Sequence, residues 1–386
     1  MSVARADGSP EFGASLGRRL TIVRGENAYL WDAGGRRYTD LGATHGVGNL
    51  GASNPEVTEA LARQARELLY LGSGYANPVR TEFLERLLSL LPSTFARVFL
   101  SNSGAEAVEA GLKIARSATG RKKIVAAMRG FHGRTLGALS ATWRREYREP
   151  FEPLVPGVVH VPYNDPVALE AAVDEETALV LLEPVQGEGG VHVATEAFLR
   201  SARDSTARTG ALLAFDEVQT GIGRTGRLFA FERWGVVPDL LLLAKSLAGG
   251  VPIGATITTD AIAERFRGSH HSTFGGSPLA CAAGRAALDF AVREHLPERA
   301  ERLGALGRER LARLPTEKVR EVRGLGLLLG IELREKVAPF LAELEARGFL
   351  ALSAGATVLR LLPPLTIPEP DWAAGLEAID EVVRHG

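Results

Sequence analysis

The fold is decided by two apolar runs that each end in a charged residue, Ala211-Leu-Leu-Ala-Phe-Asp216 and Leu240-Leu-Leu-Leu-Ala-Lys245. A third run of the same kind, Ala178-Leu-Val-Leu-Leu-Glu183, precedes them. Strands of a parallel sheet are buried on both faces, so they read as continuous apolar runs rather than alternating ones. The three runs therefore predict an α/β fold with a mainly parallel sheet that helices cover on both faces.

The rest of the chain extends this pattern and suggests a second unit. Further helices are expected over residues 56–71, 82–91 and 105–119, and further strands over residues 97–100 and 123–128. Residues 27–41 alternate apolar and polar side chains around a turn at Asp32-Ala-Gly-Gly35, which is typical of a β-hairpin. After about residue 290 the chain becomes helical and charged and then gives two strands, 326–333 and 358–362. We predict a large domain over residues 55–290 and a smaller α+β domain built from residues 1–54 and 291–386.

The composition excludes several classes of protein. The 386 residues are 45% hydrophobic and 24% charged, as in an ordinary globular enzyme, and the formal net charge of −1 gives no reason to expect a nucleic acid or membrane partner. Cys281 is the only cysteine, which excludes an internal disulfide and a thiolate-rich metal site. It lies in a small-residue helical stretch, where a buried packing role is expected. No apolar run is long enough to span a membrane, and Met1 to Gly17 reads as a loose arm without the apolar core of a signal peptide. We expect a cytoplasmic protein without a metal.

Charged residues meet where the predicted strands end. Ligands of open parallel sheets bind beyond the C-terminal ends of the strands, and Glu183, Asp216 and Lys245 stand at three such ends. An aspartate and a lysine placed there can form a structural ion pair. They are also the residue types needed for an imine-forming lysine and for a carboxylate that keeps a heterocyclic nitrogen protonated.

Two glycine-containing motifs have alternative interpretations. Asn102-Ser-Gly-Ala-Glu-Ala-Val-Glu109 follows a strand and opens a helix, so it can bind a phosphate at the helix N-terminus or form a simple capping box with Glu106. Gly221-Ile-Gly-Arg-Thr-Gly226 fits the dinucleotide fingerprint G-x-G-x-x-G. It comes after several strands and lacks the acidic residue about 20 positions later, so we interpret it as a mobile glycine-rich turn.

These residues carry a family resemblance. The stretch Asp216-Glu-Val-Gln-Thr-Gly-Ile-Gly-Arg-Thr-Gly226, with Pro238-Asp239 and Ala244-Lys-Ser-Leu-Ala-Gly-Gly250, resembles the signature of class III aminotransferases. The resemblance runs from about Gly25 to the C-terminus. It implies the fold of the fold-type I pyridoxal-phosphate enzymes and pyridoxal 5′-phosphate as cofactor.

The resemblance also implies a cofactor site. Lys245 matches the lysine that holds the cofactor as a Schiff base and later moves a proton, and Asp216 matches the partner of the pyridine nitrogen. The ring hydroxyl, the ring face and the phosphate are assigned to Gln219, to Phe131 and to Ser103-Gly104-Ala105. Thr273 matches a residue that reaches the phosphate of the neighbouring subunit, which implies a homodimer. His132 is expected to be a hydrogen-bonded neighbour rather than a catalytic base.

The implied substrates follow from two arginines. Arg134 resembles the arginine that binds the α-carboxylate of an ω-amine donor, and Arg360 the one that binds glutamate or 2-oxoglutarate. Glu188 matches the glutamate that pairs with this second arginine, and Ser272 is placed among the substrate-binding residues. Each arginine can also be a surface ion-pair partner. The implied reaction moves the ω-amino group of an N-blocked diamino acid to and from 2-oxoglutarate in lysine or arginine biosynthesis.

Several assignments of the amine stay open. Residues 120–131 and 147–151 look closest to lysine-biosynthetic aminotransferases that act on aminoadipate semialdehyde attached to the acidic carrier protein LysW. Six basic residues are either a rim for that carrier or ordinary solvated charges: Arg121, Lys122, Lys123, Arg144, Arg145 and Arg148. The alternatives are N-acetylornithine or acetyl-lysine as the amine, a 4-aminobutyrate- or ornithine-type reaction, an aminomutase or decarboxylase, and a non-enzymatic binding protein.

Overall fold

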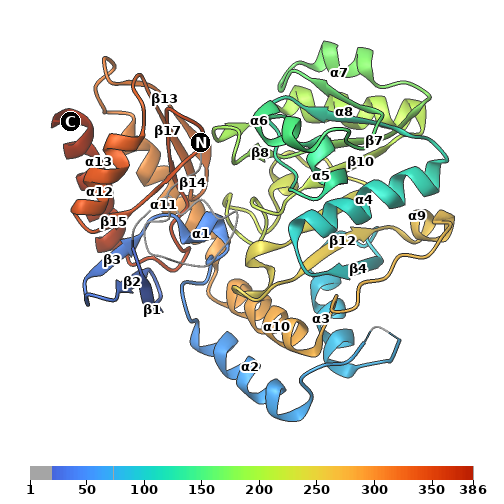
Figure 1. Ribbon diagram of the computed structural model, residues 1–386, viewed down its shortest axis with the longest axis horizontal. Helices are drawn as coiled ribbons and strands as arrows, with labels where there is room; N and C mark the ends of the chain where they lie inside the picture. The colour runs from blue at the N-terminus through green and yellow to red at the C-terminus, as the bar shows by residue number, and fades with distance from the viewer. Residues whose placement is uncertain (1–19, 73, 386) are drawn as a thin grey trace.

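The computed structural model describes residues 20–72 and 74–385, and a seven-stranded sheet lies at the centre of its larger part (Figure 1). The strand order is β4-β12-β11-β10-β7-β5-β6. Five strands, from β11 to β6 in this order, run parallel to one another, whereas β12 is antiparallel to both of its neighbours. The mainly parallel sheet is therefore confirmed. The strands are β4 (Arg97–Ser101), β5 (Lys123–Ala127), β6 (Val158–Val161), β7 (Thr177–Leu182), β10 (Leu212–Asp216), β11 (Leu240–Leu243) and β12 (Gly254–Thr258).

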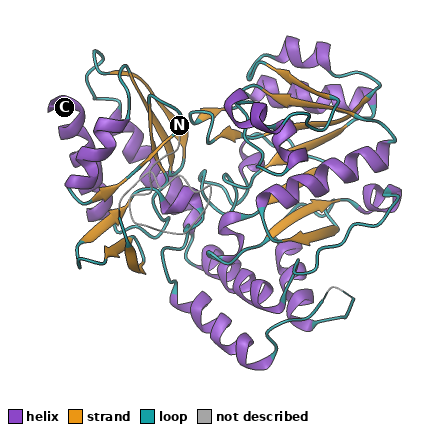
Figure 2. Ribbon diagram, in the orientation of Figure 1, coloured by secondary structure: helices purple, strands orange, loops and turns teal. Residues whose placement is uncertain are grey.

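Helices lie on both faces of this sheet (Figure 2). Successive residues of β10 belong to different cores: Leu212 and Ala214 pack in one cluster with α4, while Leu213 and Phe215 pack in another with α8. Alternation of this kind follows from the twofold period of a strand, and it confirms that both faces are buried. The helices around the sheet are α2 (Pro55–Glu67), α3 (Pro78–Ser89), α4 (Gly104–Thr119), α5 (Leu136–Ala141), α6 (Arg145–Arg148), η1 (Glu149–Phe151), α7 (Pro166–Ala172), α8 (Glu196–Thr209), η2 (Ala230–Arg233), η3 (Lys245–Ala248), α9 (Asp260–Arg265) and α10 (Pro278–Arg293).

The remaining strands form smaller sheets. One has the order β13-β14-β17-β16 and carries α11, α12 and α13 beside it (Figure 1). A second has the order β1-β2-β3-β15, in which β15 runs parallel to β3 and so joins the N-terminal strands to the C-terminal part of the chain. A third is the antiparallel pair β8-β9. The predicted hairpin is confirmed by β2 and β3, while the division into domains at residues 55 and 290 stays a prediction. The elements are β1 (Ile22–Glu26), β2 (Tyr29–Asp32), β3 (Arg37–Asp40), α1 (Ala43–Gly46), β8 (Val185–Gln186), β9 (His192–Val193), α11 (Leu296–Leu311), β13 (Val319–Leu325), β14 (Leu328–Leu333), α12 (Ala338–Ala346), β15 (Phe349–Leu350), β16 (Leu352–Ser353), β17 (Val358–Leu361) and α13 (Glu369–His385).

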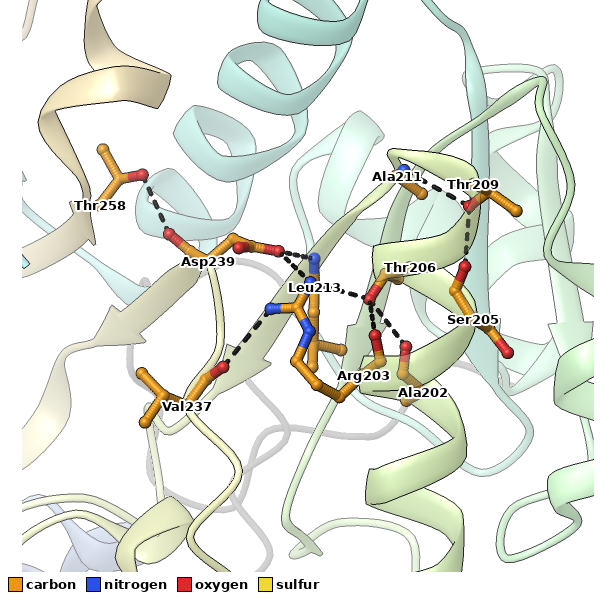
Figure 3. Close-up of polar contacts among 10 residues, drawn as sticks. All are labelled: Ala202, Arg203, Ser205, Thr206, Thr209, Ala211, Leu213, Val237, Asp239 and Thr258. Atoms are coloured by element: carbon orange, nitrogen blue, oxygen red, sulfur yellow. Dashed lines mark hydrogen bonds and ion pairs between the residues drawn. The ribbon is translucent and has the colours of Figure 1, made fainter. Parts of the chain in front are cut away.

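Asp239 fixes the start of the central strands (Figure 3). Its carboxylate accepts hydrogen bonds from the backbone N–H of Leu213 at 2.8 Å and from Arg203 at 2.9 Å, and its carbonyl accepts one from the Thr258 hydroxyl at 3.0 Å. One aspartate thus ties β10, β12 and α8 together at the edge of the sheet opposite the C-terminal ends of β10 and β11. This gives the Pro238-Asp239 motif a structural role.

The glycine-rich turn at residues 221–226 is buried, so the prediction that it is mobile was wrong. Arg224 is fully buried and donates to the carbonyls of Leu327 and Pro363 and to the side chain of Asn49. The arginine therefore ties this turn to the segments that follow β13 and β17.

Other predictions concern single segments. Cys281 is buried, as predicted, and burial raises the pKa of its thiol to about 12. Among the described residues, no helix is long and apolar enough to cross a membrane. The predicted loose arm, Met1 to Gly17, lies outside the described residues.

Candidate active site

A cavity of about 290 Å³ lies where β7, β10 and β11 end. It brings together eight of the residues singled out in the sequence: Gly104, Ala105, Phe131, Arg134, Glu188, Asp216, Gln219 and Lys245. His132, Gly133, Glu183 and Val218 complete its lining. The cavity therefore has the position expected for the ligand site of a parallel sheet.

Lys245 is held by an unusual backbone at the end of β11. The strand stops at Leu243, two residues earlier than predicted, and Lys245 begins a 3₁₀ turn with a left-handed φ of 48°. Removal from water lowers the pKa of its amine below the ordinary value. A larger fraction of the amine is thus uncharged near neutral pH, as a nucleophile or a base requires.

Asp216 has a fixed partner on the opposite side. Its carboxylate lies 2.8 Å from Nδ1 of His132 and accepts a hydrogen bond from the backbone N–H of Val218 at 3.1 Å. Burial lowers the pKa of His132, but the hydrogen bond and the charge of Asp216 outweigh this effect, and the pKa lies above its ordinary value. His132 is thus a hydrogen-bonded neighbour, as expected, and its Nε2 has no partner among the described residues.

Glu183 is a site residue that the sequence placed at a strand end but to which it assigned no role. Its carboxylate accepts hydrogen bonds from the backbone N–H groups of Phe131 at 2.9 Å and Gly187 at 3.2 Å. Burial raises the pKa of Glu183 to about 7. The residue joins the loops on either side of the cavity, and its place at the end of an apolar run was the available signal.

The N-terminus of α4 contributes backbone donors. Gly104 and Ala105 begin this 16-residue helix and line the cavity, so N–H groups without an acceptor inside the helix lie at its wall. A Cβ atom at Gly104 would lie 2.7 Å from Val218, so a side chain would not fit there. Ser103 instead caps the helix, accepting from Glu106 N–H at 3.2 Å, and does not line the cavity. Ser103 therefore forms the helix cap, while the backbone N–H groups of Gly104 and Ala105 provide the anion-binding geometry.

The two predicted arginines differ in their surroundings. Arg360 is completely buried, and its guanidinium donates to Glu188 Oε1 at 2.6 Å and to Gln219 Oε1 at 3.4 Å. Burial raises the pKa of Glu188, but His45 and Arg360 outweigh this and hold it well below its usual range. His45 also lies 3.1 Å from Arg360, a contact that no sequence motif indicated.

Arg134 is exposed and lies between two aromatic rings. Its guanidinium carbon is 3.7 Å from the ring centre of Tyr147 and 5.5 Å from that of Phe131. Stacking of this kind holds the guanidinium in place while it leaves the edge free for a carboxylate.

Ser272 and Thr273 lie outside this cavity. They line a neighbouring one together with Asn102 and Glu106, and the Ser272 hydroxyl accepts hydrogen bonds from Asn102 at 3.1 Å and from the backbone N–H of Gly275 at 3.0 Å. The structure therefore does not bring either residue to Lys245 of the same chain.

The proposed basic rim consists of two separate groups. Arg121 and Lys123 lie where β5 begins; the arginine donates to the carbonyls of Thr177 and Thr209, and the lysine pairs with Asp174 at 2.6 Å. A five-residue strand is roughly 16 Å long, so these residues are at the far edge of the sheet. Of the two interpretations, a single rim that contains all six basic residues is therefore excluded. Arg129, Arg144, Arg145 and Arg148 instead line a cavity of about 860 Å³ that includes Gly189, next to Glu188.

Comparisons with known proteins agree with this geometry. The family model for class III aminotransferases matches residues 14–383. The chain is 47% identical over 368 residues to an acetylornithine aminotransferase of Methanopyrus kandleri, covering 95% of this chain and 94% of that protein. The chain belongs to the class III aminotransferases.

Two further relatives extend the comparison. A [LysW]-aminoadipate semialdehyde transaminase of Deinococcus radiodurans is 47% identical over 368 residues, covering 94% of this chain and 84% of that protein. A structure of the ornithine aminotransferase of Toxoplasma gondii, described with partial occupancy of pyridoxal phosphate at the active site, matches with a TM-score of 0.92 and 34% identity. The match covers 96% of this chain and 92% of that one. The fold is thus that of the fold-type I enzymes, and the chain is a pyridoxal-phosphate-dependent aminotransferase.

The lining of the Lys245 cavity fits this cofactor. The buried amine of Lys245 suits an aldehyde, and the carboxylate of Asp216, paired with His132, suits a basic ring nitrogen. The N–H groups at the start of α4 suit a phosphate. Among the described residues, no group of three or more acidic, histidine or cysteine side chains could hold a metal ion.

Proposed function

We propose that this aminotransferase moves the terminal amino group of a diamino acid whose α-amine is blocked, with glutamate and 2-oxoglutarate as the second substrate pair. One observation carries the proposal: Arg134 lines the Lys245 cavity, Arg360 lies behind it and donates to the lining residues Glu188 and Gln219, and only Arg360 is neutralised by a glutamate. Two substrates that differ in their number of carboxylates require such a pair of sites.

The cofactor-binding roles follow from the cavity lining. When bound, pyridoxal phosphate supplies an electron-withdrawing ring that acidifies the proton on the amine-bearing carbon of the substrate. Lys245 would hold the aldehyde carbon and, once released, would move that proton. Asp216 holds a proton at the ring nitrogen, and the N–H groups of Gly104 and Ala105 bind the phosphate. Phe131 covers the ring and Gln219 approaches its hydroxyl.

The arginines sort the two substrates. Arg134 binds the α-carboxylate of the amine donor, because its stacked guanidinium is exposed beside the cavity. Arg360 stays paired with Glu188 while this substrate reacts. Glutamate brings a second carboxylate, which displaces Glu188 from Arg360 and forms the bidentate pair that guanidinium geometry favours.

The blocked diamino acid is supported by the relatives and by the arginine cavity. Two relatives are named for acetylornithine and for LysW-borne aminoadipate semialdehyde. LysW is an acidic carrier, and the cavity beside Gly189 has one more positive than negative side chain in its lining. It is lined by four arginines, Arg129, Arg144, Arg145 and Arg148, and by three glutamates, Glu146, Glu149 and Glu152. We propose carrier-linked lysine as the preferred amine and lysine biosynthesis as the pathway, with N-acetylornithine and arginine biosynthesis as the second candidate. Free ornithine is less well supported as the amine, because the ornithine aminotransferase is 34% identical to this chain, whereas the other two relatives are 47% identical.

The active unit is proposed to be a cytoplasmic homodimer. Thr273 and Phe274 are exposed and line the cavity next to the N-terminus of α4. A second copy placing its Thr273 against that helix would complete the phosphate site. Light scattering should give twice the chain mass, and a monomer that is fully active would contradict this proposal.

The substrate proposal is tested in single half-reactions. The absorbance of the bound cofactor is followed after mixing with carrier-linked lysine, N-acetylornithine or 4-aminobutyrate. We expect the fastest bleaching with carrier-linked lysine. Preference for N-acetylornithine would assign the enzyme to the arginine pathway, and preference for 4-aminobutyrate would contradict the blocked diamino acid.

A further inference from the structure

The turn that carries His45 has a strained backbone beside the Glu188–Arg360 pair. Four consecutive residues have left-handed φ angles: Ala43 at 41°, Thr44 at 49°, His45 at 60° and Gly46 at 81°. For residues other than glycine this conformation costs roughly 1–2 kcal/mol each. Strain of this kind persists only where the surroundings enforce it, and it is concentrated at functional sites.

The surroundings enforce this turn from both sides. The Asp40 carboxylate accepts hydrogen bonds from the backbone N–H groups of Gly42 and Ala43, both at 2.8 Å. Gln219, from the cavity, donates to the carbonyl of His45 at 3.0 Å. The position of the imidazole is therefore set by fixed contacts rather than by chance.

One imidazole nitrogen lies between a cation and an anion. Nδ1 of His45 is 3.1 Å from a guanidinium nitrogen of Arg360 and 3.4 Å from Oε1 of Glu188. A neutral ring with a lone pair at Nδ1 accepts from Arg360, and the other neutral tautomer donates to Glu188 without compensating its charge. Only the imidazolium both donates to Glu188 and neutralises it, and Arg360 repels that form. The two protonation states of His45 thus favour opposite arrangements of the pair.

The side chains of His45, Glu188 and Arg360 differ in their exposure to solvent. The side chain of His45 is 53% exposed, that of Glu188 28%, and that of Arg360 0%. When a substrate carboxylate takes Arg360, Glu188 is left as a largely buried anion, which is costly without a new partner. Of the charged groups that face it, Arg360 is then occupied and the amine of Lys245 would be linked to the cofactor, so His45 is the remaining side chain that can compensate its charge.

We propose that His45 is the second partner of Glu188, which it binds as an imidazolium when a dicarboxylate substrate displaces Glu188 from Arg360. This rests on the exchange at Arg360 in the proposed function. The charges balance: the substrate carboxylate neutralises Arg360, and a proton from solvent on His45 neutralises Glu188. Binding of the dicarboxylate is therefore accompanied by uptake of one proton, whereas a blocked amine donor with a single carboxylate binds without it.

Calorimetry measures this proton directly. The holoenzyme is titrated with glutarate, an unreactive dicarboxylate, in buffers of different ionisation enthalpy at pH about 8, above the range in which histidine usually titrates. The wild type should take up close to one proton. His45→Asn should take up nearly none and bind glutarate about tenfold more weakly. Asparagine tolerates the left-handed backbone and places an amide near Nδ1, but it does not titrate.

Two further variants distinguish a failure of the role of His45 from a failure of the carboxylate exchange at Arg360. His385→Asn, at the end of α13, should behave as the wild type. Proton uptake that is absent in the wild type, or unchanged in His45→Asn, overturns the role of His45. Arg360→Lys should weaken glutarate binding at least about tenfold because the bidentate pair is lost. If it does not, the exchange at Arg360 itself is wrong.

Discussion

The two sides of the Lys245 cavity hold their charged groups in different ways. On the side of β7 and β10, Asp216 and Glu183 are buried. Asp216 is paired with the buried His132, and Glu183 accepts a hydrogen bond from the backbone of Phe131. On the side of β17, Arg360 divides its hydrogen bonds among Glu188, Gln219 and His45. Fixed partners suit a cofactor that stays bound through both half-reactions. Exchangeable partners suit substrates that alternate.

The largest effect is expected on the fixed side, at Lys245. Lys245→Ala should lower the rate of each half-reaction at least ~10⁴-fold, because both the cofactor linkage and the proton-transferring base are lost. Stopped-flow absorbance measures the rates. The melting temperature is the control and should change little; a variant that keeps more than a few per cent of the rate would show that another group moves the proton.

Asp216→Asn should have the next largest effect. Without the carboxylate the ring nitrogen loses its proton, so proton removal should slow ~10²–10³-fold, as expected for one preorganised electrostatic contact. The measurement is the rate of deuterium exchange at the amine-bearing carbon. Equal slowing by Glu183→Gln would mean that general disturbance of the buried side, rather than the contact at the ring nitrogen, explains the result.

Reversing one charge in the cavity lined by Arg129, Arg144, Arg145 and Arg148 should have a smaller effect on substrate binding. Arg144→Glu should raise KM for carrier-linked lysine about 2–5-fold at low salt, which is the value of an exposed ion pair, and added salt should remove the difference. Lys122→Glu, an exposed reversal at the far edge of the sheet, is the matched control and should have no effect. Equal effects of the two variants, or the same effect on free N-acetylornithine, would contradict carrier docking at this cavity.

The smallest effect concerns stability. The pKa of His132 is raised in the folded protein, so its pairing with Asp216 contributes stability that is complete below the unfolded pKa of about 6.5 and is lost as the pH rises through the folded pKa. The melting-temperature difference between the wild type and His132→Gln should therefore shrink by ~2 °C as the pH rises through that range. A difference that grows with pH would reverse the assigned sign.

The sequence was sufficient to predict the residues on the side with fixed partners, but it did not predict all of those on the side with exchangeable partners. Asp216 and Lys245 follow apolar runs, and strand ends meet at one edge of a parallel sheet, so their proximity could be predicted. His45 could not, because Ala43 and Thr44 disfavour a left-handed backbone, and the contacts of Asp40 and Gln219 hold the turn in that conformation. Arg224 was missed because burial of an arginine depends on carbonyls about a hundred residues or more away in the sequence.

Two further features were not resolved by the sequence. β12, Gly254-Ala-Thr-Ile-Thr258, lacks a continuous apolar run, so the antiparallel strand in the sheet was not predicted. The rim combined basic residues at the start of β5 with residues that come after it, and the length of the strand separates them.

The most direct test of the account is Glu188→Gln, with both half-reactions measured on the same preparation. The amide does not neutralise Arg360, so the amine donor would be drawn to the wrong arginine. We predict that kcat/KM for the blocked amine falls about tenfold or more, while kcat/KM for glutamate is kept or rises. An equal fall in both values would show that Glu188 has a structural role, and that its contact with Arg360 does not sort the two substrates.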